Sequence, residues 1–292
     1  MKTKHWIIFI TLGFIWSSSF LWIKIGVQEI GPTSLVAFRV LFGAITAGIV
    51  AIYMKSEWPT DIKTLAHFAI IGPTSLAIPI FLISWGEQTI DSAVASVLNA
   101  TVPLFTIIIS HLWLHDDKMT PQKVTGLLIG FIGILILFSK DLLDSKHTHI
   151  IGQLAVVLAS LFYAGGAVYT RKVTAHVQGM SRNALPLITA TCFMWMIIPI
   201  SDKPLLIPAL PITWVAVFWL GVFGSGFAML MFYYLLHEIG PTRTSLVTYI
   251  FPVGGVILGV IFLGETLSWQ LLAGSVLIIA SLFVANYKPK TS

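Results

Sequence analysis

Ten long apolar runs, separated by short polar stretches, constrain the fold of this 292-residue chain more than any other feature. Each run holds about 18–25 residues, close to the roughly 20 that a helix needs to cross the hydrocarbon core of a bilayer. The runs lie at 6–28, 33–54, 64–86, 92–114, 121–139, 150–170, 183–200, 212–236, 243–263 and 269–287. Charged residues make up only 10% of the chain, against roughly 25% in soluble domains. The sequence therefore predicts an all-α membrane protein with ten transmembrane helices and no sizeable soluble domain.

Basic residues are distributed unevenly between the two sides of this predicted bundle. With the N-terminus placed in the cytoplasm, 12 of the 17 Lys and Arg residues lie at cytoplasmic span ends, three lie on the opposite side and two lie inside spans. Cytoplasmic loops of membrane proteins carry such an excess. We therefore expect both termini to be cytoplasmic, and the net charge of +5 requires no nucleic-acid partner.

One stretch of the sequence occurs twice, at 97–127 and 246–275. Each copy has a proline within an apolar run, then an acid, a helix-capping hydroxyl and a glycine. The matched positions are Pro103 and Pro252, Asp116 and Glu265, Thr120 and Ser268, and Gly126 and Gly274. Such self-similarity indicates an internal duplication, with repeat 1 at 1–139 (spans 1–5) and repeat 2 at 150–292 (spans 6–10). Because five is odd, the repeats are inverted in the membrane, as is typical of secondary transporters with a substrate site near mid-membrane.

The repeated prolines and two glycine pairs suggest how the spans are shaped. A proline removes a helix hydrogen bond and kinks the chain, and the freed carbonyl needs a partner in protein or in a water-lined cavity. We expect Pro103 and Pro252 to shape the cavity wall and gating, although tolerated kinks inherited from one ancestor are the alternative. The GxxxG pairs at 126–130 and 255–259 favour internal helix packing over dimerisation. The oligomeric state stays open between monomer and homodimer.

All twelve acidic residues lie in loops or at span ends. Ion-driven carriers often have an acid at mid-membrane, where a charge is tolerated only for function. Its absence argues against a simple carboxylate relay, although Glu87 and Glu238 near span ends keep one open. The sequence also predicts no metal site, no cofactor and no catalytic residues, because no hydrolase, phosphate-binding or zinc motif is present.

Two basic residues lie inside spans, Lys24 near the outer end of span 1 and Arg39 near the outer end of span 2. One interpretation is structural: Lys24 snorkels, and Arg39 pairs with an acid or with helix-end carbonyls. The sharper hypothesis is that one of them attracts a carboxylate of the substrate.

Several aromatic and polar residues fall at corresponding depths of equivalent spans. Pockets for small amphipathic metabolites combine an aromatic face with a few fixed polar groups. The remaining candidate substrate-binding residues are Trp16, Ser17, Phe20, Asn99, Tyr163 and Tyr249. The Ser17 hydroxyl is ambiguous, because it can bond either substrate or a carbonyl of its own helix.

Several of these residues belong to a pattern that resembles the EamA family of the drug/metabolite transporter superfamily. The pattern comprises 16–20 (WSSSF) with Lys24, Pro32 with Arg39, 240–245 (GPTRTS), Tyr249, Pro252 and 263–268 (LGETLS). In the first half, residues 115–120 (HDDKMT) replace the family's usual Gly-Glu-Arg-Leu-Ser-like turn with one extra residue. The resemblance implies a ten-helix inverted-repeat carrier in the bacterial inner membrane, with relatives that largely export amino acids and related metabolites. Substrate does not transfer with a fold.

The sequence therefore predicts a secondary transporter that exports amino acids or similar small metabolites, with the lipid bilayer as its other partner. A multidrug or nucleotide-sugar carrier is the second hypothesis within that class. A membrane-embedded enzyme and a non-transporting accessory or sensor protein are the alternatives outside it.

Overall fold

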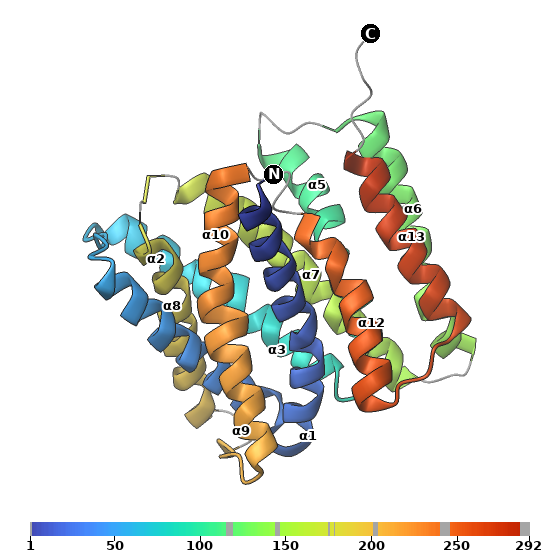
Figure 1. Ribbon diagram of the computed structural model, residues 1–292, viewed down its shortest axis with the longest axis horizontal. Coiled ribbons are helices and arrows are strands. Elements are labelled where there is room, and N and C mark those ends of the chain that lie inside the picture. The colour runs from blue at the N-terminus through green and yellow to red at the C-terminus, as the bar shows by residue number, and fades with distance from the viewer. Residues whose placement is uncertain are drawn as a thin grey trace.

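The computed structural model describes residues 2–114, 119–143, 147–174, 176–177, 179–200, 204–239 and 246–286 as a bundle of helices and helical turns, with no strand among them. The start of α1 and the end of α13 lie at the same end of the bundle (Figure 1). The opposite end, called the distal end below, is formed by the bend of α1, the corner at 86–91 and the loop at 264–268.

The described helices of the first half correspond to predicted spans 1–5. They are α1 (Thr3–Tyr53), α2 (Ile62–Gly72), η1 (Pro73–Ala77), α3 (Ile78–Gly86), α4 (Ser92–Asn99), α5 (Val102–Trp113) and α6 (Pro121–Leu143). Those of the second half are α7 (His147–Val173), α8 (Ser181–Ile197), η2 (Ile198–Ile200), α9 (Pro211–Phe218), η3 (Trp219–Phe227), α10 (Ala228–Ile239), η4 (Leu246–Tyr249), α12 (Ile250–Leu263) and α13 (Trp269–Asn286).

Helix α1 consists of two helices that meet at Gly31. This glycine has φ 68° and ψ 172°, a backbone conformation that residues with a Cβ rarely adopt. Pro32 follows it and starts the second helix, where its fixed φ is favourable and its missing N–H is not needed. The chain therefore reverses direction at the distal end, as the dark-blue and mid-blue ribbons show in Figure 1.

The two repeated prolines interrupt or modify the helices that contain them. Predicted span 4 is divided into α4 and α5, with Pro103 in the first turn of α5. In the second half, a 3₁₀ turn precedes α12, and Pro252 is the third residue of that helix. Pro103 cannot bond the carbonyl of Asn99, and Pro252 cannot bond that of Thr248, which explains why both breaks lie just before the prolines. The helix breaks coincide with the two repeated prolines, and a role of these prolines in the cavity wall or in gating stays a prediction.

A second pair of irregularities was not predicted. Residues 73–77 (η1) and 219–227 (η3) form π-helical turns, which are rare and concentrate at functional sites. Both lie in the middle of a longer apolar helix, one in each half. The helices that contain them begin at Ile62 and Pro211. The number of residues between these two starts equals the number between Pro103 and Pro252. The duplication therefore extends to this local feature.

Most helical segments of one half pack against a segment of the other half. Helix α1 contacts η3, α8, α10 and α12, while α7 contacts α3, α4 and α5. Two further contacts join α4 to α12 and α6 to α13. The green α6 and the red α13 lie side by side in Figure 1. The two halves are thus interlocked rather than placed side by side as separate domains.

Glycines allow the close approach of α6 and α13. A Cβ added at Gly126 would lie 2.6 Å from the Ala285 Cβ, and one added at Gly130 would lie 3.0 Å from the Ser281 Oγ. In α12, a Cβ at Gly255 would overlap the Ser96 side chain of α4. Both glycine pairs therefore serve internal packing, as the sequence favoured.

Length and composition identify six described helices that are apolar enough to cross a membrane, of which α1 is one. Two shorter apolar helices, Val247–Leu263 and Trp269–Ala285, add to them. Many large apolar side chains are exposed along these helices, among them Ile49, Ile52, Leu135 and Ile261. Such a surface requires an apolar surrounding, so the chain is a polytopic membrane protein.

Candidate functional site

Aromatic side chains from three helices meet beside the π-helical turn η3. The Trp16 ring lies 5.6 Å from that of Phe232 and 5.9 Å from that of Phe251, measured between ring centroids. Phe20, one turn along α1, lies 6.4 Å from Phe251. The Trp16 indole N–H donates to the Gly224 carbonyl at 3.1 Å. Two predicted residues, Trp16 and Phe20, therefore belong to one aromatic group that joins α1 to the second half.

The serines that follow Trp16 bond mainly within their own helix. Ser17 Oγ donates to the Phe14 carbonyl at 3.1 Å, and its side chain is fully buried. Ser18 donates to the Ile15 carbonyl and accepts a hydrogen bond from the Trp219 indole at 2.9 Å. Of the two interpretations of Ser17, the bond to its own helix is the one that the structure contains. Its tight packing against Gly254 also makes it a contact between the halves.

Lys24 binds the end of a helix. Its ammonium donates to the carbonyls of Glu87 at 2.6 Å and Ile90 at 2.8 Å. Cations are favoured at helix C-termini, where free carbonyls and the helix dipole present negative charge. Lys24 therefore stabilises the C-terminal end of α3 rather than extending freely toward the interface. Of the ten predicted site residues, it is the one that lines a cavity described below.

Arg39 is 7% exposed and lies against η3, where its Nε donates to the Ser225 hydroxyl at 3.2 Å. The Tyr163 phenol and the Glu87 carboxyl lie within electrostatic range of its guanidinium. Arg39 therefore brings the second part of α1, the π-helical turn, α7 and the end of α3 into one polar group. Arg39 and Tyr163, both predicted, do come together.

Asn99 and Tyr249 lie in two other environments. Asn99 is buried at the end of α4, where its Oδ1 accepts a hydrogen bond from Ser160 of α7 at 3.5 Å. The Tyr249 ring lies 4.8 Å from that of Phe283 on α13 and packs against the cluster that contains Leu104 and Leu282. The structure therefore distributes the predicted pocket residues over several groups instead of one continuous lining.

Two acids that the site prediction omitted join the halves at the distal end. Glu265 accepts hydrogen bonds from the backbone N–H groups of Ser92 at 2.7 Å and Ala93 at 2.9 Å. Glu29 accepts from the N–H of Leu210, just before α9. Carboxylates at helix N-termini satisfy free amides and complement the dipole. The repeated acid at position 265 was the sequence signal for the first of these contacts.

Glu87 is the third omitted acid and the most deeply buried. It ends α3, it is 0% exposed, and within the described residues neither carboxyl oxygen accepts a hydrogen bond. Its position beside Lys24 and Arg39, at the end of an apolar run, was visible in the sequence. Its complete burial was not.

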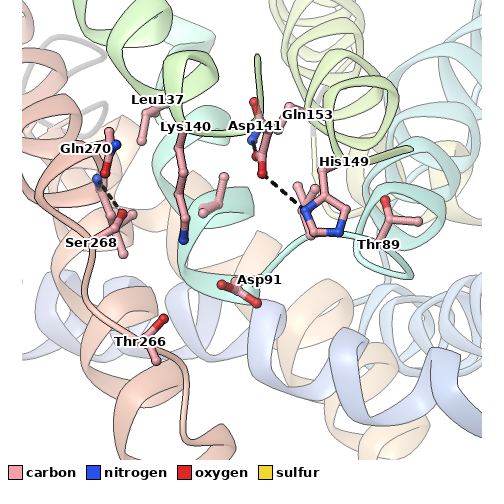
Figure 2. A pocket seen from close by; sticks show the side chains of 13 residues that line it. Thr89, Asp91, Leu137, Lys140, Asp141, His149, Gln153, Thr266, Ser268 and Gln270 are labelled. Atoms are coloured by element: carbon pink, nitrogen blue, oxygen red, sulfur yellow. Dashed lines mark hydrogen bonds and ion pairs between the residues drawn. The ribbon is translucent and has the colours of Figure 1, made fainter. Parts of the chain in front are cut away.

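Two cavities open at the distal end and share Asp91 and Thr266 in their linings. The first, of about 240 Å³, is lined also by Lys140, Asp141 and His149, among others. Figure 2 shows the Lys140 and Asp91 side chains directed into the same space, with His149 beside Asp141. His149 Nδ1 lies 3.2 Å from Asp141 Oδ1. The first cavity therefore presents charges of both signs: the Lys140 cation, the Asp91 carboxylate, and Asp141 with its His149 partner.

The second cavity, of about 290 Å³, is lined by Lys24, Gln28 and Glu265 together with the loop that follows α12. It carries charges of both signs, as the first cavity does. Among the described residues, no cluster of three or more His, Cys, Asp or Glu side chains could hold a metal ion.

Some sequence motifs lie outside the described residues. They are Asp116 with the rest of 115–118, and the 240–245 segment. The two predicted capping hydroxyls, Thr120 and Ser268, lie within the described residues, and both predictions are confirmed. Thr120 Oγ accepts from the Lys123 N–H at 3.3 Å, and Ser268 Oγ accepts from the Leu271 N–H at 3.1 Å.

A family model described as the EamA-like transporter family matches residues 4–139 and 150–287. Together with the exposed apolar helices and the interlocked halves, this defines a polytopic membrane transporter rather than an enzyme. The chain belongs to the EamA-like transporter family. The family resemblance that the sequence motifs indicated is therefore confirmed.

Named relatives extend over most of the chain. It is 25% identical over 290 residues to "Uncharacterized transporter YoaV" of Bacillus subtilis (strain 168), which covers 98% of this chain and 97% of that protein. It is 30% identical over 257 residues to "Uncharacterized inner membrane transporter YedA" of Escherichia coli (strain K12), with 87% and 81% covered. A solved structure described as "Crystal structure of protein" has a TM-score of 0.68 at 19% identity and covers 98% of both chains, which supports the fold alone.

Proposed function

We propose that this protein is a secondary transporter of the inner membrane that exports amino acids or related small metabolites by alternating access. It has ten spans in two inverted repeats, 1–139 and 150–292, with both termini in the cytoplasm. The distal end of the bundle then faces away from the cytoplasm.

The observation that carries the proposal is the exchange of packing partners between the halves. The helix that starts the first half packs against η3 of the second, and α7, which starts the second half, packs against α3 and η1 of the first. Two halves related in this way can exchange conformations, which is the basis of alternating access in inverted-repeat carriers. The matched π-helical turns and proline breaks supply the irregular backbone at which such helices bend.

The side chains support a small substrate that carries both charge and apolar surface. Arg39 and Lys24 provide positive charge near the distal end, and Trp16, Phe20 and Tyr163 provide aromatic surface deeper in the bundle. The distal cavity that contains Lys140 and Asp91 offers charges of both signs, which complement an amino-acid zwitterion. We include Ser17, Asn99, Tyr249, Pro103 and Pro252 as residues that shape the pathway between the halves.

Counterflow in proteoliposomes tests the proposal. Proteoliposomes that contain the purified protein are preloaded with unlabelled amino acids or metabolites. Uptake of the labelled compound is then followed with and without a pH gradient. We expect a saturable signal that empty liposomes lack. A panel that includes cationic drugs and nucleotide sugars separates the amino-acid proposal from the other carrier classes.

The Arg39→Ala variant tests the substrate-binding part of the proposal. If Arg39 binds a substrate carboxylate, the variant loses affinity for amino acids but not for uncharged analogues of similar size. Lys55→Ala, which removes an exposed cation at the end of α1, is the matched control. An unchanged apparent affinity in a folded Arg39→Ala protein would exclude Arg39 as the carboxylate-binding residue.

A further inference from the structure

The Glu87 carboxyl group occupies an unusual place for an acid in a membrane protein. It lies at the corner between α3 and α4, it has no exposed surface, and neither of its oxygens accepts a hydrogen bond within the described residues. Buried acids are normally paired or hydrogen-bonded, because an ionised group that lacks both is strongly destabilised. A fully buried acid without a hydrogen-bond partner is therefore a candidate functional group.

Charged groups surround Glu87, but their hydrogen bonds go to other atoms. Lys24 of α1 bonds the backbone carbonyls of Glu87 and Ile90, not the carboxyl oxygens. Arg39 bonds Ser225, and Glu265 adds a second negative charge while it bonds two amides of α4. The nearby cations therefore compensate the charge of Glu87 only at a distance.

The remaining helix packed against α3 adds no direct partner. Helix α7 directs Tyr163 toward Arg39, and its His149 is paired with Asp141. Gly86 lies directly against Gly152 of α7, so this side of the corner is closed by backbone. The arrangement around the carboxyl group is more compatible with a neutral acid than with a carboxylate.

We propose that Glu87 is the proton-binding site through which this transporter couples substrate movement to a proton gradient. In the arrangement described here the carboxyl group holds a proton. When the corner at 86–91 moves away from α7 and Glu265, the O–H bond breaks and the proton passes to water in the second distal cavity. The carboxylate then remains beside Lys24 and Arg39, which stabilise its charge. Lys24 connects the two places, because it bonds the Glu87 carbonyl and lines that cavity.

The inference deepens the proposed transport function by naming its coupling ion, and it also makes a prediction that is independent of transport. Infrared spectroscopy of the full chain in lipid detects protonated carboxyl groups. We expect a protonated carboxyl band at neutral pH in the wild type, and glutamate labelled with ¹³C should shift it. The Glu87→Gln variant should lose the band, and Glu57→Gln, which alters an exposed glutamate at the other end of the bundle, should keep it.

Transport measurements provide the second readout. A pH gradient should stimulate substrate uptake by the wild type and by Glu57→Gln, while Glu87→Gln should exchange substrate without any response to the gradient. A wild-type protein with no protonated glutamate at neutral pH overturns the proposal, and so does a gradient response that survives in Glu87→Gln. The absence of the band in the wild type overturns the proposal even if the variant fails to fold. If no compound is transported, the proposed function fails, while the infrared band still tests Glu87.

Discussion

The contact of Glu265 with the start of α4 offers the sharpest test of how the two halves are held together at the distal end. One carboxylate accepts the N–H groups of Ser92 and Ala93, at 2.7 and 2.9 Å, and so links the loop after α12 to the opposite half. Replacing Glu265 with alanine removes both bonds and the negative charge at the helix N-terminus. The two amides then have no other described partner at that distance.

The size of the effect follows from these two bonds. A hydrogen bond to a charged group contributes roughly 1.5–3 kcal/mol net. Because the two bonds share one partly exposed carboxylate, we take about 3 kcal/mol for the pair rather than the full sum. If the distal end opens during transport, this energy applies to the closed state only. The equilibrium should then move toward the open state by roughly 100-fold, since 1.4 kcal/mol corresponds to a factor of ten.

Cysteine accessibility measures that shift. Ser96 of α4 is fully buried against Gly255 of α12. Its side chain becomes accessible only if these two helices separate. In a Cys192→Ala background, the rate at which a maleimide labels Ser96→Cys reports the open fraction. We expect Glu265→Ala to raise this rate by up to two orders of magnitude, and Glu265→Gln by less. An unchanged rate in Glu265→Ala, with Glu57→Ala as the control, would refute the role of Glu265 as a distal link.

Two further predictions concern stability. Gly126→Ala should destabilise the protein by about 1–3 kcal/mol through overpacking, because the new Cβ would lie 2.6 Å from that of Ala285. Thermal unfolding in detergent measures this loss. The control is Gly48→Ala, whose new Cβ has nothing within 4 Å and which should be neutral or stabilising in the same assay. The Thr64 backbone N–H, which donates to Asp61 at the start of α2, lowers the pKa of that carboxyl group. The stabilisation should be complete above the ordinary Asp pKa of about 3.9 and be lost as the pH falls through the lowered pKa, so the acid-induced decrease in Tm should be smaller in Asp61→Asn. Equal thermal stability of the two glycine variants, or identical pH profiles for Asp61→Asn and the wild type, would contradict these two accounts.

The sequence predicted the features that depend on local chemistry. Apolar runs of membrane length fixed the helical class, Pro103 fixed the position of a break, and the capping hydroxyls of Thr120 and Ser268 act where they were expected. Each of these follows from one residue and its immediate neighbours. The duplication added long-range information, because matched positions in two copies occupy equivalent places.

The features that the sequence did not predict depend on contacts between distant segments. The π-helical turns have no simple sequence signal, and in η3 the Gly224 carbonyl and the Ser225 hydroxyl bond Trp16 and Arg39 of α1. Tyr249 lies in the 3₁₀ turn before α12, and its ring contacts Phe283 of α13. From the sequence, Glu87 is an acid at the end of a span, and only the packing of α3 against α1 and α7 shows that it is buried. Charge at a span end does not reveal depth or partners.

Alternating access between the two halves is the central claim, and a reversible lock at the distal end tests it most directly. Thr89 and Thr266 come from opposite halves and line the first distal cavity, so cysteines at these positions, in the Cys192→Ala background, can be joined by a short reducible crosslinker. The account predicts saturable counterflow before crosslinking, loss of counterflow after it, and recovery on reduction, while each single-cysteine variant stays active. Counterflow that persists in the fully crosslinked protein would contradict the claim.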